Sequence, residues 1–248
     1  MKKEIQMSKT RIGNEIEHGK YLAGLDNGNF WYWTSPAGQE RLKRRRQVFA
    51  AQLTAGMNVL ELGCGSGDFT KSLAETKTRV TAVDISPDLI ASARKKVPDA
   101  NVTFKVENAY ELNYADHTFD AVIGNSILHH LEMDQAFKEI YRVLKPGKGI
   151  CFIEPNMLNP LQIIELSTLY TRKIFRHSPD ETAIVRWKMK KMLEAHGFEN
   201  VRVAPFDFLH PNTPKCLIPL VRKLGFIAEK TPLLREISGS LLITANKE

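Results

Sequence analysis

The 248-residue sequence has no apolar run of about 18 residues, so we expect no transmembrane helix. Its first nine residues are polar and charged and lack the apolar core of a secretory signal, which predicts a cytoplasmic protein. Cysteine is scarce: Cys64, Cys151 and Cys216 are scattered without the spacing of a metal site or a disulfide framework. We therefore expect reduced thiols and no bound metal.

The chain also lacks internal repeats, low-complexity tracts and linker-like stretches. With 43% hydrophobic residues it is long enough to bury a large core, which predicts a single domain over residues 1–248. The net charge is +7. Such an excess is compatible with nucleic acid, an anionic membrane surface or an acidic substrate, and it does not choose among them.

What the sequence does contain is a glycine-rich stretch after a short apolar run. Residues 57–62 are followed by Gly63, Gly65 and Gly67 and then by an amphipathic pattern. This order predicts a strand, a tight turn and a helix. Glycine reaches positive φ without strain and lets a ligand approach the backbone, and a helix start adds free N–H groups. We expect a ligand here, although an ordinary strand-to-helix turn has the same pattern.

The glycine spacing narrows the choice of ligand. A dinucleotide fingerprint would need its third glycine at position 68, where Asp68 stands, so an NAD(P) oxidoreductase is disfavoured. The pattern is instead E-x-G-x-G-x-G, starting at Glu61. It resembles the first motif of class I S-adenosylmethionine-dependent methyltransferases, in which the loop wraps the methionine and ribose parts of the cofactor.

A second buried strand, residues 79–84, ends in Asp84. A carboxylate at this strand tip can accept hydrogen bonds from both ribose hydroxyls of a nucleotide. The alternative is an acid that serves the next helix. Ser86, directly before Pro87, is the better cap for that helix, which leaves Asp84 for a ligand.

The third predicted strand, residues 102–106, is followed by Asn108 and Ala109. In the resembled family an acid followed by alanine commonly occupies this turn, and the acid accepts a hydrogen bond from the adenine amino group. Asn108 departs from that pattern. Its amide oxygen can accept the same bond without the assistance of a charge.

The fourth predicted strand, residues 119–124, leads into Asn125, Ser126 and the pair His129-His130. Strand ends at the switch point of a parallel sheet form a ligand crevice, so this segment should flank the transferable methyl group. A histidine there can take a proton from the acceptor. His129 is the first candidate and His130 the second; alternatively, one packs in a helix and the other only forms a wall. The N/D-P-P-Y signature of amino methylation of bases and glutamine is absent.

The resemblance implies S-adenosylmethionine as cofactor and S-adenosylhomocysteine as product, with in-line displacement as the mechanism. It covers residues 40–155 well and 197–246 more weakly, and it points to the ubiquinone/menaquinone-type and natural-product branches. The cofactor site that it implies consists of Glu61, Gly63, Cys64, Gly65, Gly67, Asp84, Ile85, Asn108, Ala109, Asn125 and Ser126.

The order of predicted elements, completed by strands at 149–154, from 201 and at 240–245, resembles the family's fold. That fold is α/β: a doubly wound, Rossmann-like seven-stranded sheet with an antiparallel C-terminal hairpin. A helix over 137–144 should stop at the Lys145-Pro146-Gly147 sequence before the fifth strand.

Ahead of the glycine-rich strand lies a lead-in, residues 1–34. Residues 1–30 show weak periodicity and are expected to be irregular or partly mobile, and the aromatic run 30–33 either caps the cofactor site or packs a helix onto the sheet. A helix should start at Ser35-Pro36, run to about Leu53 and bury Leu42, Phe49 and Leu53.

That helix carries a basic run at positions 41–46. The run is a candidate phosphate-binding patch, a solvated helix face, or the source of an arginine that holds the cofactor carboxylate or an acidic substrate. Its basic members are Arg41, Lys43, Arg44, Arg45 and Arg46.

Two segments fall outside the resemblance. Residues 157–180 predict a helical insertion over the substrate side, with basic residues at Arg172, Lys173, Arg176 and His177. Residues 209–236 contain an amphipathic piece, 216–226, that either packs over the crevice or contacts a membrane surface.

Three hypotheses for function follow. The first is a methyltransferase for a small-molecule acceptor, such as a lipid-linked molecule or a sugar. The second is an RNA methyltransferase that uses the basic run 41–46. The third is a catalytically silent S-adenosylmethionine-binding protein.

Overall fold

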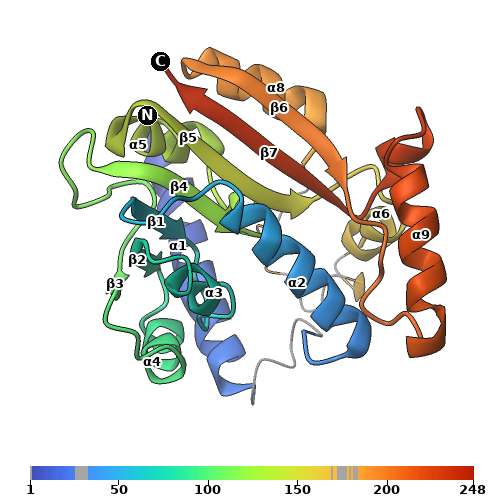
Figure 1. The fold of residues 1–248 in the computed structure, drawn as a ribbon. Helices are drawn as coiled ribbons and strands as arrows, with labels where there is room; N and C mark the ends of the chain where they lie inside the picture. The colour runs from blue at the N-terminus through green and yellow to red at the C-terminus, as the bar shows by residue number, and fades with distance from the viewer. Residues whose placement is uncertain (1, 26–32, 169, 172–177, 179, 181–183) are drawn as a thin grey trace.

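The computed structural model describes residues 2–25, 33–168, 170, 171, 178, 180 and 184–248, with the side chains of residues 2–9 excepted. Its sheet has seven strands in the order β3-β2-β1-β4-β5-β7-β6 (Figure 1). Strands β1 to β5 are parallel, and β7 is antiparallel to both of its neighbours, as predicted. The strands are β1 Asn58–Leu62, β2 Arg79–Asp84, β3 Val102–Val106, β4 Phe119–Asn125, β5 Leu144–Pro155, β6 Phe198–Phe206 and β7 Ser240–Lys247.

Helices cover both faces of the sheet. On one face α5 and α8 pack in a core cluster with apolar side chains of the strands, and on the other α2, α3 and α4 do the same. Short 3-10 turns (η2 Leu128–His130, η3 Lys215–Leu217, η4 Leu234–Ile237) join the elements. The helices are α1 Lys2–Gly24, α2 Pro36–Ala50, α3 Thr70–Ala74, α4 Pro87–Lys96, α5 Met133–Val143, α6 Pro160–Leu166, α8 Arg186–Ala195 and α9 Ile218–Ala228.

Local sequence explains where two of these helices begin. The Ser35 hydroxyl accepts a hydrogen bond from the Gly38 amide, and the Ser86 hydroxyl accepts one from the Leu89 amide. In both helices proline follows the cap, where its missing N–H costs nothing. The predicted caps are confirmed.

The lead-in differs from the expectation. Residues 2–24 are not irregular but form the helix α1, which packs against α4. The inward face of α1 includes glycine and charged side chains as well as apolar ones. For this reason the helical spacing of its inward residues was not recognised in the sequence. Residues 30–32 of the aromatic run lie outside the described residues, whereas Trp33 is buried.

Some boundaries also differ. Strand β5 begins at Leu144, directly after α5, so the predicted stop sequence 145–147 lies within the strand. Helix α2 buries Leu42 and Phe49 as predicted, but it ends at Ala50, and Leu53 beyond it is half-buried.

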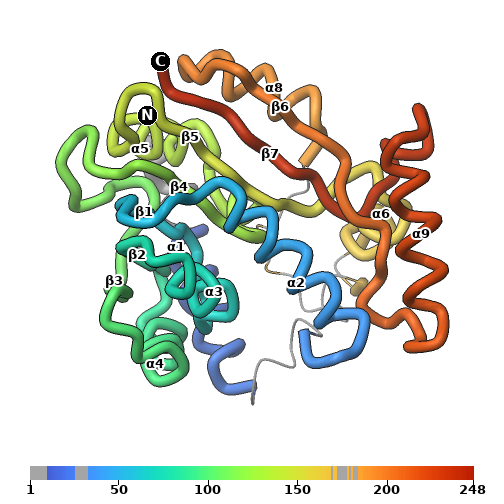
Figure 2. Tube along the Cα trace, in the orientation of Figure 1, coloured from blue at the N-terminus to red at the C-terminus, as the bar shows by residue number. Residues whose placement is uncertain are grey.

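The two segments outside the resemblance contain helices where the structure describes them. In 157–180 the described helix is α6, and the basic residues predicted at 172, 173, 176 and 177 lie outside the described residues. In 209–236 the main element is α9, which lies beside the sheet end near α6 (Figure 2). No helix within the described ranges is both long and apolar enough to cross a membrane.

Candidate functional site

A cavity of about 1170 Å³, its open mouth included, lies at the carboxyl ends of β1, β2 and β4. Strand β1 pairs with β2 on one side and with β4 on the other, so the chain changes direction across the sheet here. This switch point is where open parallel sheets bind ligands. The cavity is walled by the glycine loop after β1, by the ends of β2 and β4, by residues 107–110, and by α1.

The three loop glycines differ in what they do. All have positive φ, 64° at Gly63, 53° at Gly65 and 83° at Gly67. Around Gly65 no atom lies within 4 Å of where a Cβ would be, so a ligand can reach the backbone there. Gly67 does not line the cavity, and a Cβ there would meet Ala93 of α4 and Val97 directly after it at 3.3 Å. We conclude that Gly67 shapes the loop and its packing.

Asp84 links the end of β2 to this loop. One carboxylate oxygen accepts from the Gly65 amide and the other from the Ser86 amide, both at 2.9 Å. Burial raises the pKa of Asp84, while the two amide hydrogen bonds act in the opposite direction. Each oxygen has a further lone pair that can accept a hydrogen bond, and Asp84 lines the cavity. The geometry suits a ligand with two adjacent hydroxyls, such as a ribose.

Glu61 lies behind the loop. It is buried at 4% exposure, does not line the cavity, and accepts a hydrogen bond from the Thr70 hydroxyl at 2.7 Å. Burial raises its pKa to about 8, so the carboxyl is largely protonated at neutral pH. Its position couples the end of β1 to α3.

The remaining predicted cofactor residues, Cys64, Ile85, Asn108, Ala109, Asn125 and Ser126, all line the cavity. The Asn108 side-chain oxygen accepts from the Tyr110 amide at 3.0 Å, which fixes the orientation of its amide group. Within the described residues no group of three His, Cys, Asp or Glu could hold a metal ion.

The two histidines have different environments. His129 is 3% exposed and outside the cavity, with its Nδ1 2.7 Å from a carboxylate oxygen of Glu154. His130 lines the cavity, and its Nδ1 lies 3.1 Å from a carboxylate oxygen of Glu15 in α1. Geometry therefore favours His130, the second candidate, over the first.

Helix α1 covers one side of the cavity and forms its roof, which was not predicted from the sequence. Helix α1 contributes residues at helical spacing to the lining: Arg11, Ile12, Glu15, His18, Gly19 and Leu22. These residues recur at intervals of three and four positions, and this spacing was the sequence signal that could have predicted a helix facing the cavity. Arg11 fixes the roof in place because it donates to the His130 carbonyl at 3.3 Å and pairs with Glu132 at 3.2 Å.

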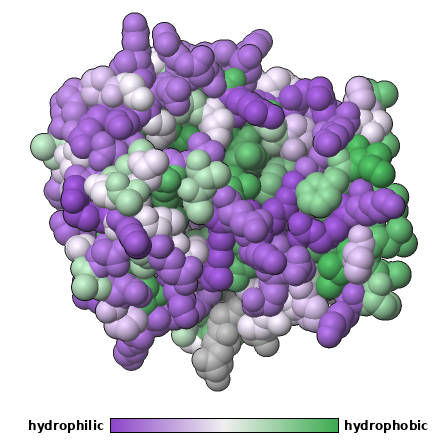
Figure 3. Space-filling view, in the orientation of Figure 1, coloured by the Kyte–Doolittle hydropathy of each residue, from purple (hydrophilic) through white to green (hydrophobic). Residues whose placement is uncertain are grey.

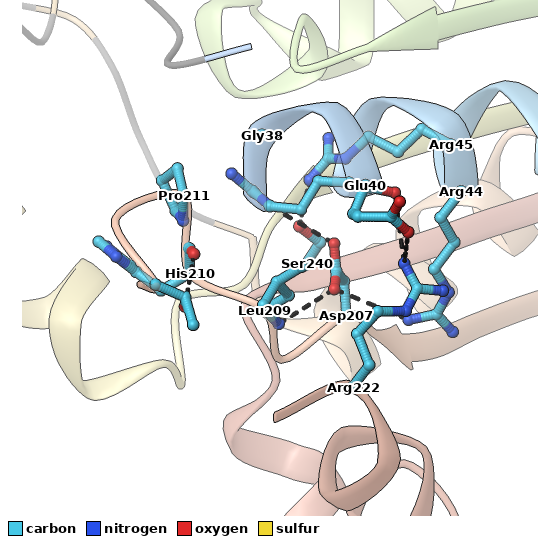
Figure 4. Close-up of polar contacts among 12 residues, drawn as sticks. Gly38, Glu40, Arg44, Arg45, Asp207, Leu209, His210, Pro211, Arg222 and Ser240 are labelled. Carbon is cyan, nitrogen blue, oxygen red and sulfur yellow. Dashed lines mark hydrogen bonds and ion pairs between the residues drawn. The ribbon is translucent and has the colours of Figure 1, made fainter. Parts of the chain in front are cut away.

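The basic run of α2 is neither a phosphate patch nor a solvated face. Arg44 makes two hydrogen bonds to the Glu229 carboxylate, at 2.6 and 2.7 Å. Nε of Arg41 lies 3.5 Å from the Asp207 carboxylate. Arg44 also lies 3.7 Å from Asp207, and Figure 4 shows both residues between α2 and the segment that follows β6. Only Lys43 of the basic residues in the run is fully exposed.

Arg45 is the most buried residue of that run, at 3% exposure. Its guanidinium donates to the Asn125 side-chain oxygen at 2.6 Å and to the Ser240 hydroxyl at 2.7 Å. Burial lowers its pKa to about 9. Because Asn125 lines the cavity, Arg45 orients a cavity residue from outside the cavity.

Comparison with known proteins agrees with this geometry. The family described as "Methyltransferase domain" matches residues 60–153. A demethylmenaquinone methyltransferase of Chlorobaculum parvum is 32% identical over 203 residues, which cover 75% of this chain and 79% of the relative. A ubiquinone/menaquinone biosynthesis C-methyltransferase of Hydrogenovibrio crunogenus is 30% identical over 191 residues, or 65% of this chain and 73% of the relative.

A methyltransferase-like protein of Schizosaccharomyces pombe is 31% identical, and this chain spans only 64% of its length. Among solved structures, the N-methyltransferase NodS of Bradyrhizobium japonicum has a TM-score of 0.65 at 16% identity, covering 94% of this chain and 98% of NodS. The Haemonchus contortus phosphoethanolamine N-methyltransferase 2 has a TM-score of 0.60 at 19% identity, covering 94% of this chain and 56% of that enzyme. These likenesses show the fold. With the sequence relatives, they establish that the chain belongs to the class I S-adenosylmethionine-dependent methyltransferases.

Proposed function

We propose that this enzyme transfers a methyl group to a small, largely apolar ring compound of the isoprenoid-quinone precursor type. The observation that carries the proposal is the position of α1, which covers one side of the cavity and narrows it to a space suited to a small acceptor. The apolar side chains of Ile12, Leu22 and Leu131 contribute to its lining. Two relatives whose names refer to menaquinone chemistry support the same choice of acceptor.

In the proposed reaction S-adenosylmethionine supplies an electrophilic methyl group that the acceptor atom attacks in line. The protein's largest contribution is to hold the two partners in that line. Asp84 and the glycine loop would hold the ribose and methionine parts, Asn108 and Ala109 would contact the adenine, and Asn125 would lie on the methionine side.

An acceptor that carries a proton needs a base. We assign this role to His130, because it lines the cavity and has the Glu15 carboxylate 3.1 Å from its Nδ1. An imidazole in the cavity wall can take the proton that the acceptor releases, and the carboxylate beside it constrains the ring. Glu15 is then a positioning residue.

The assignment predicts a specific pattern of rates. His130→Asn should lower the methyl-transfer rate by about 10²-fold or more while the dissociation constant for S-adenosylhomocysteine stays within about twofold. His129→Asn removes a buried contact with Glu154, so it should lower the melting temperature and leave the rate per folded molecule near that of the wild type. A His130→Asn enzyme with an unchanged rate would remove His130 from the mechanism.

The alternative of RNA methylation loses its main support, because the arginines of α2 face carboxylates and polar groups inside the protein. The silent-binder hypothesis keeps the same cofactor site and differs only in turnover.

One experiment separates the three hypotheses. The protein is incubated with methyl-labelled S-adenosylmethionine and a cell extract, and label is measured in the organic-soluble, small aqueous and nucleic-acid fractions. We expect label in the organic-soluble fraction. Label in the small aqueous fraction would keep a small acceptor and contradict an apolar one, and label in RNA would contradict both. No label in any fraction, with S-adenosylhomocysteine still bound, would favour the silent binder.

A further inference from the structure

Exposed apolar side chains gather on one part of the molecule. Of the fifteen large hydrophobic residues that are exposed among the described residues, twelve belong to the segments 161–170 and 217–237. We call this set the α6–α9 face: Leu161, Ile163, Ile164, Tyr170, Leu217, Leu220, Leu224, Phe226, Ile227, Leu233, Leu234 and Ile237. Scattered single exposures need no explanation, whereas a concentration of this kind marks an interaction site.

The segments of the face are tied together. The side-chain amide of Asn159, which caps α6, donates to the Ile237 carbonyl at 2.9 Å, and η4 follows α9 after a short turn. Figure 3 shows apolar side chains at the right edge of the molecule, where Figure 1 places α9.

Helix α9 has two apolar sides, of which one packs against the rest of the protein and the other is exposed. Ile218 and Val221 pack inward in a small core with Ala37 and Leu209. The outer stripe recurs in steps of three, four and three residues, the spacing of one helix face. Its members Leu217, Leu220, Leu224 and Ile227 are 45–55% exposed.

Backbone strain points to the same place. Leu233 has a φ of 68°, a left-handed conformation that is unfavourable for leucine. Its side chain is 84% exposed, the highest value among the exposed large hydrophobic residues described. No burial inside the molecule offsets this strain, which is the pattern expected where a residue serves an external contact.

The acidic residues within the segments of the face, Glu165, Glu229 and Glu236, interact with other residues of the chain, whereas exposed lysines around α9 do not within its described part. The sequence from Phe208 to Ala228 contains no acidic residue. Lys215, Lys223 and Lys230 are exposed, and none of the three has an ion pair among the described residues. A second copy of this chain, with a net charge of +7, would bring like charges together, whereas anionic headgroups would complement them.

From these observations we propose that the α6–α9 face docks on an anionic lipid membrane surface, with the apolar side chains inserted at the headgroup boundary and the lysines against the headgroups. In this arrangement the α6–α9 face lies against the surface of the bilayer. The proposal does not depend on the methyl acceptor, because docking is measured without turnover.

The test is co-sedimentation of the full chain with phosphatidylcholine vesicles, with and without about a third phosphatidylglycerol. We expect binding to the anionic vesicles that weakens as salt is added. The double variant Leu220→Ser/Leu224→Ser should lower the apparent affinity by at least about tenfold. The matched control is Val106→Ser, which removes an exposed apolar side chain from β3 at the far edge of the sheet and should bind like the wild type.

Circular dichroism and S-adenosylhomocysteine affinity verify that each variant is folded. Equal binding to neutral and anionic vesicles, or no binding to either, would overturn the proposal. So would a concentration-dependent dimer of the wild type that the double variant abolishes, since the face would then join two copies. Failure of the methyl-transfer proposal would leave these results unchanged.

Discussion

Glu61 has the most strongly raised carboxyl pKa at the site, and this gives it a distinct pH signature. Its ordinary pKa of 4.5 applies to the unfolded chain, whereas burial raises the folded value to about 8. Between these values the unfolded chain releases a proton that the folded protein keeps. The free energy of unfolding should therefore fall as pH rises from about 4.5 to about 8, by an amount on the order of a few kcal/mol.

Glu61→Gln keeps an oxygen that can accept from Thr70 but cannot titrate, so we expect a shallower decline of melting temperature over this pH range. The exposed Glu75→Gln is the control and should keep the wild-type slope. If Glu61→Gln and the wild type lose stability in parallel, Glu61 is not the group responsible.

Single residues differ in how far the sequence predicts them. Gly63, Gly65 and Asp84 were expected at a ligand site from short strand-to-turn patterns, and the structure places all three in the cavity lining. The order of the two histidines could not be predicted, because the ring that turns inward contacts Glu154, which lies 25 residues further on. The position of Glu61 behind the loop could not be predicted either, because it depends on a hydrogen bond from Thr70 in the next helix.

At the scale of the element, α1 is the part of the site that was not predicted from the sequence. One of its close contacts with the rest of the protein is at Gly19, where a Cβ would lie 2.5 Å from the Ser86 Cβ. Gly13, on the exposed side of the same helix, has nothing within 4 Å of its Cβ position. The two glycines therefore provide a matched pair of substitutions.

Gly19→Ala should destabilise the protein by about 1–3 kcal/mol, because the new methyl group forces α1 away from α4. Gly13→Ala should instead stabilise it by about 0.5–1 kcal/mol, since alanine favours a helix over glycine. Chemical denaturation measures both. Equal effects of the two substitutions would show that α1 does not pack as described.

Helix α2 illustrates why a charge run is a poor guide by itself. The partner of Arg44 is Glu229, 185 residues away, and Arg41 lies beside Asp207. Sequence spacing within α2 gives no sign of either carboxylate. The start of the helix, by contrast, depends on Ser35 and Pro36 alone and was predicted correctly.

At the scale of the whole molecule, the seven-stranded α/β sheet and its antiparallel C-terminal hairpin were predicted from the alternation of strands and helices together with the family resemblance. The helix of the lead-in was not predicted, and the helices expected in the two insertions could not be placed in space, because no family pattern covers these segments. They form the roof of the cavity and the α6–α9 face, the parts that distinguish this enzyme from others with the same sheet.

A single domain over residues 1–248 remains a prediction. If it holds, thermal unfolding followed by far-ultraviolet circular dichroism and by tryptophan fluorescence should give one coincident transition. Two separated transitions would indicate that part of the chain folds independently.

The central claim is that the cavity beneath α1 binds the cofactor through Asp84. Calorimetric titration of the full chain with S-adenosylhomocysteine tests it most directly. Asp84→Ala should weaken binding by at least about tenfold, or about 1.4 kcal/mol, because charge-assisted hydrogen bonds to the ribose are lost. Asp88→Ala, at an exposed position of α4, should bind like the wild type. An unchanged dissociation constant for a folded Asp84→Ala protein would contradict the account.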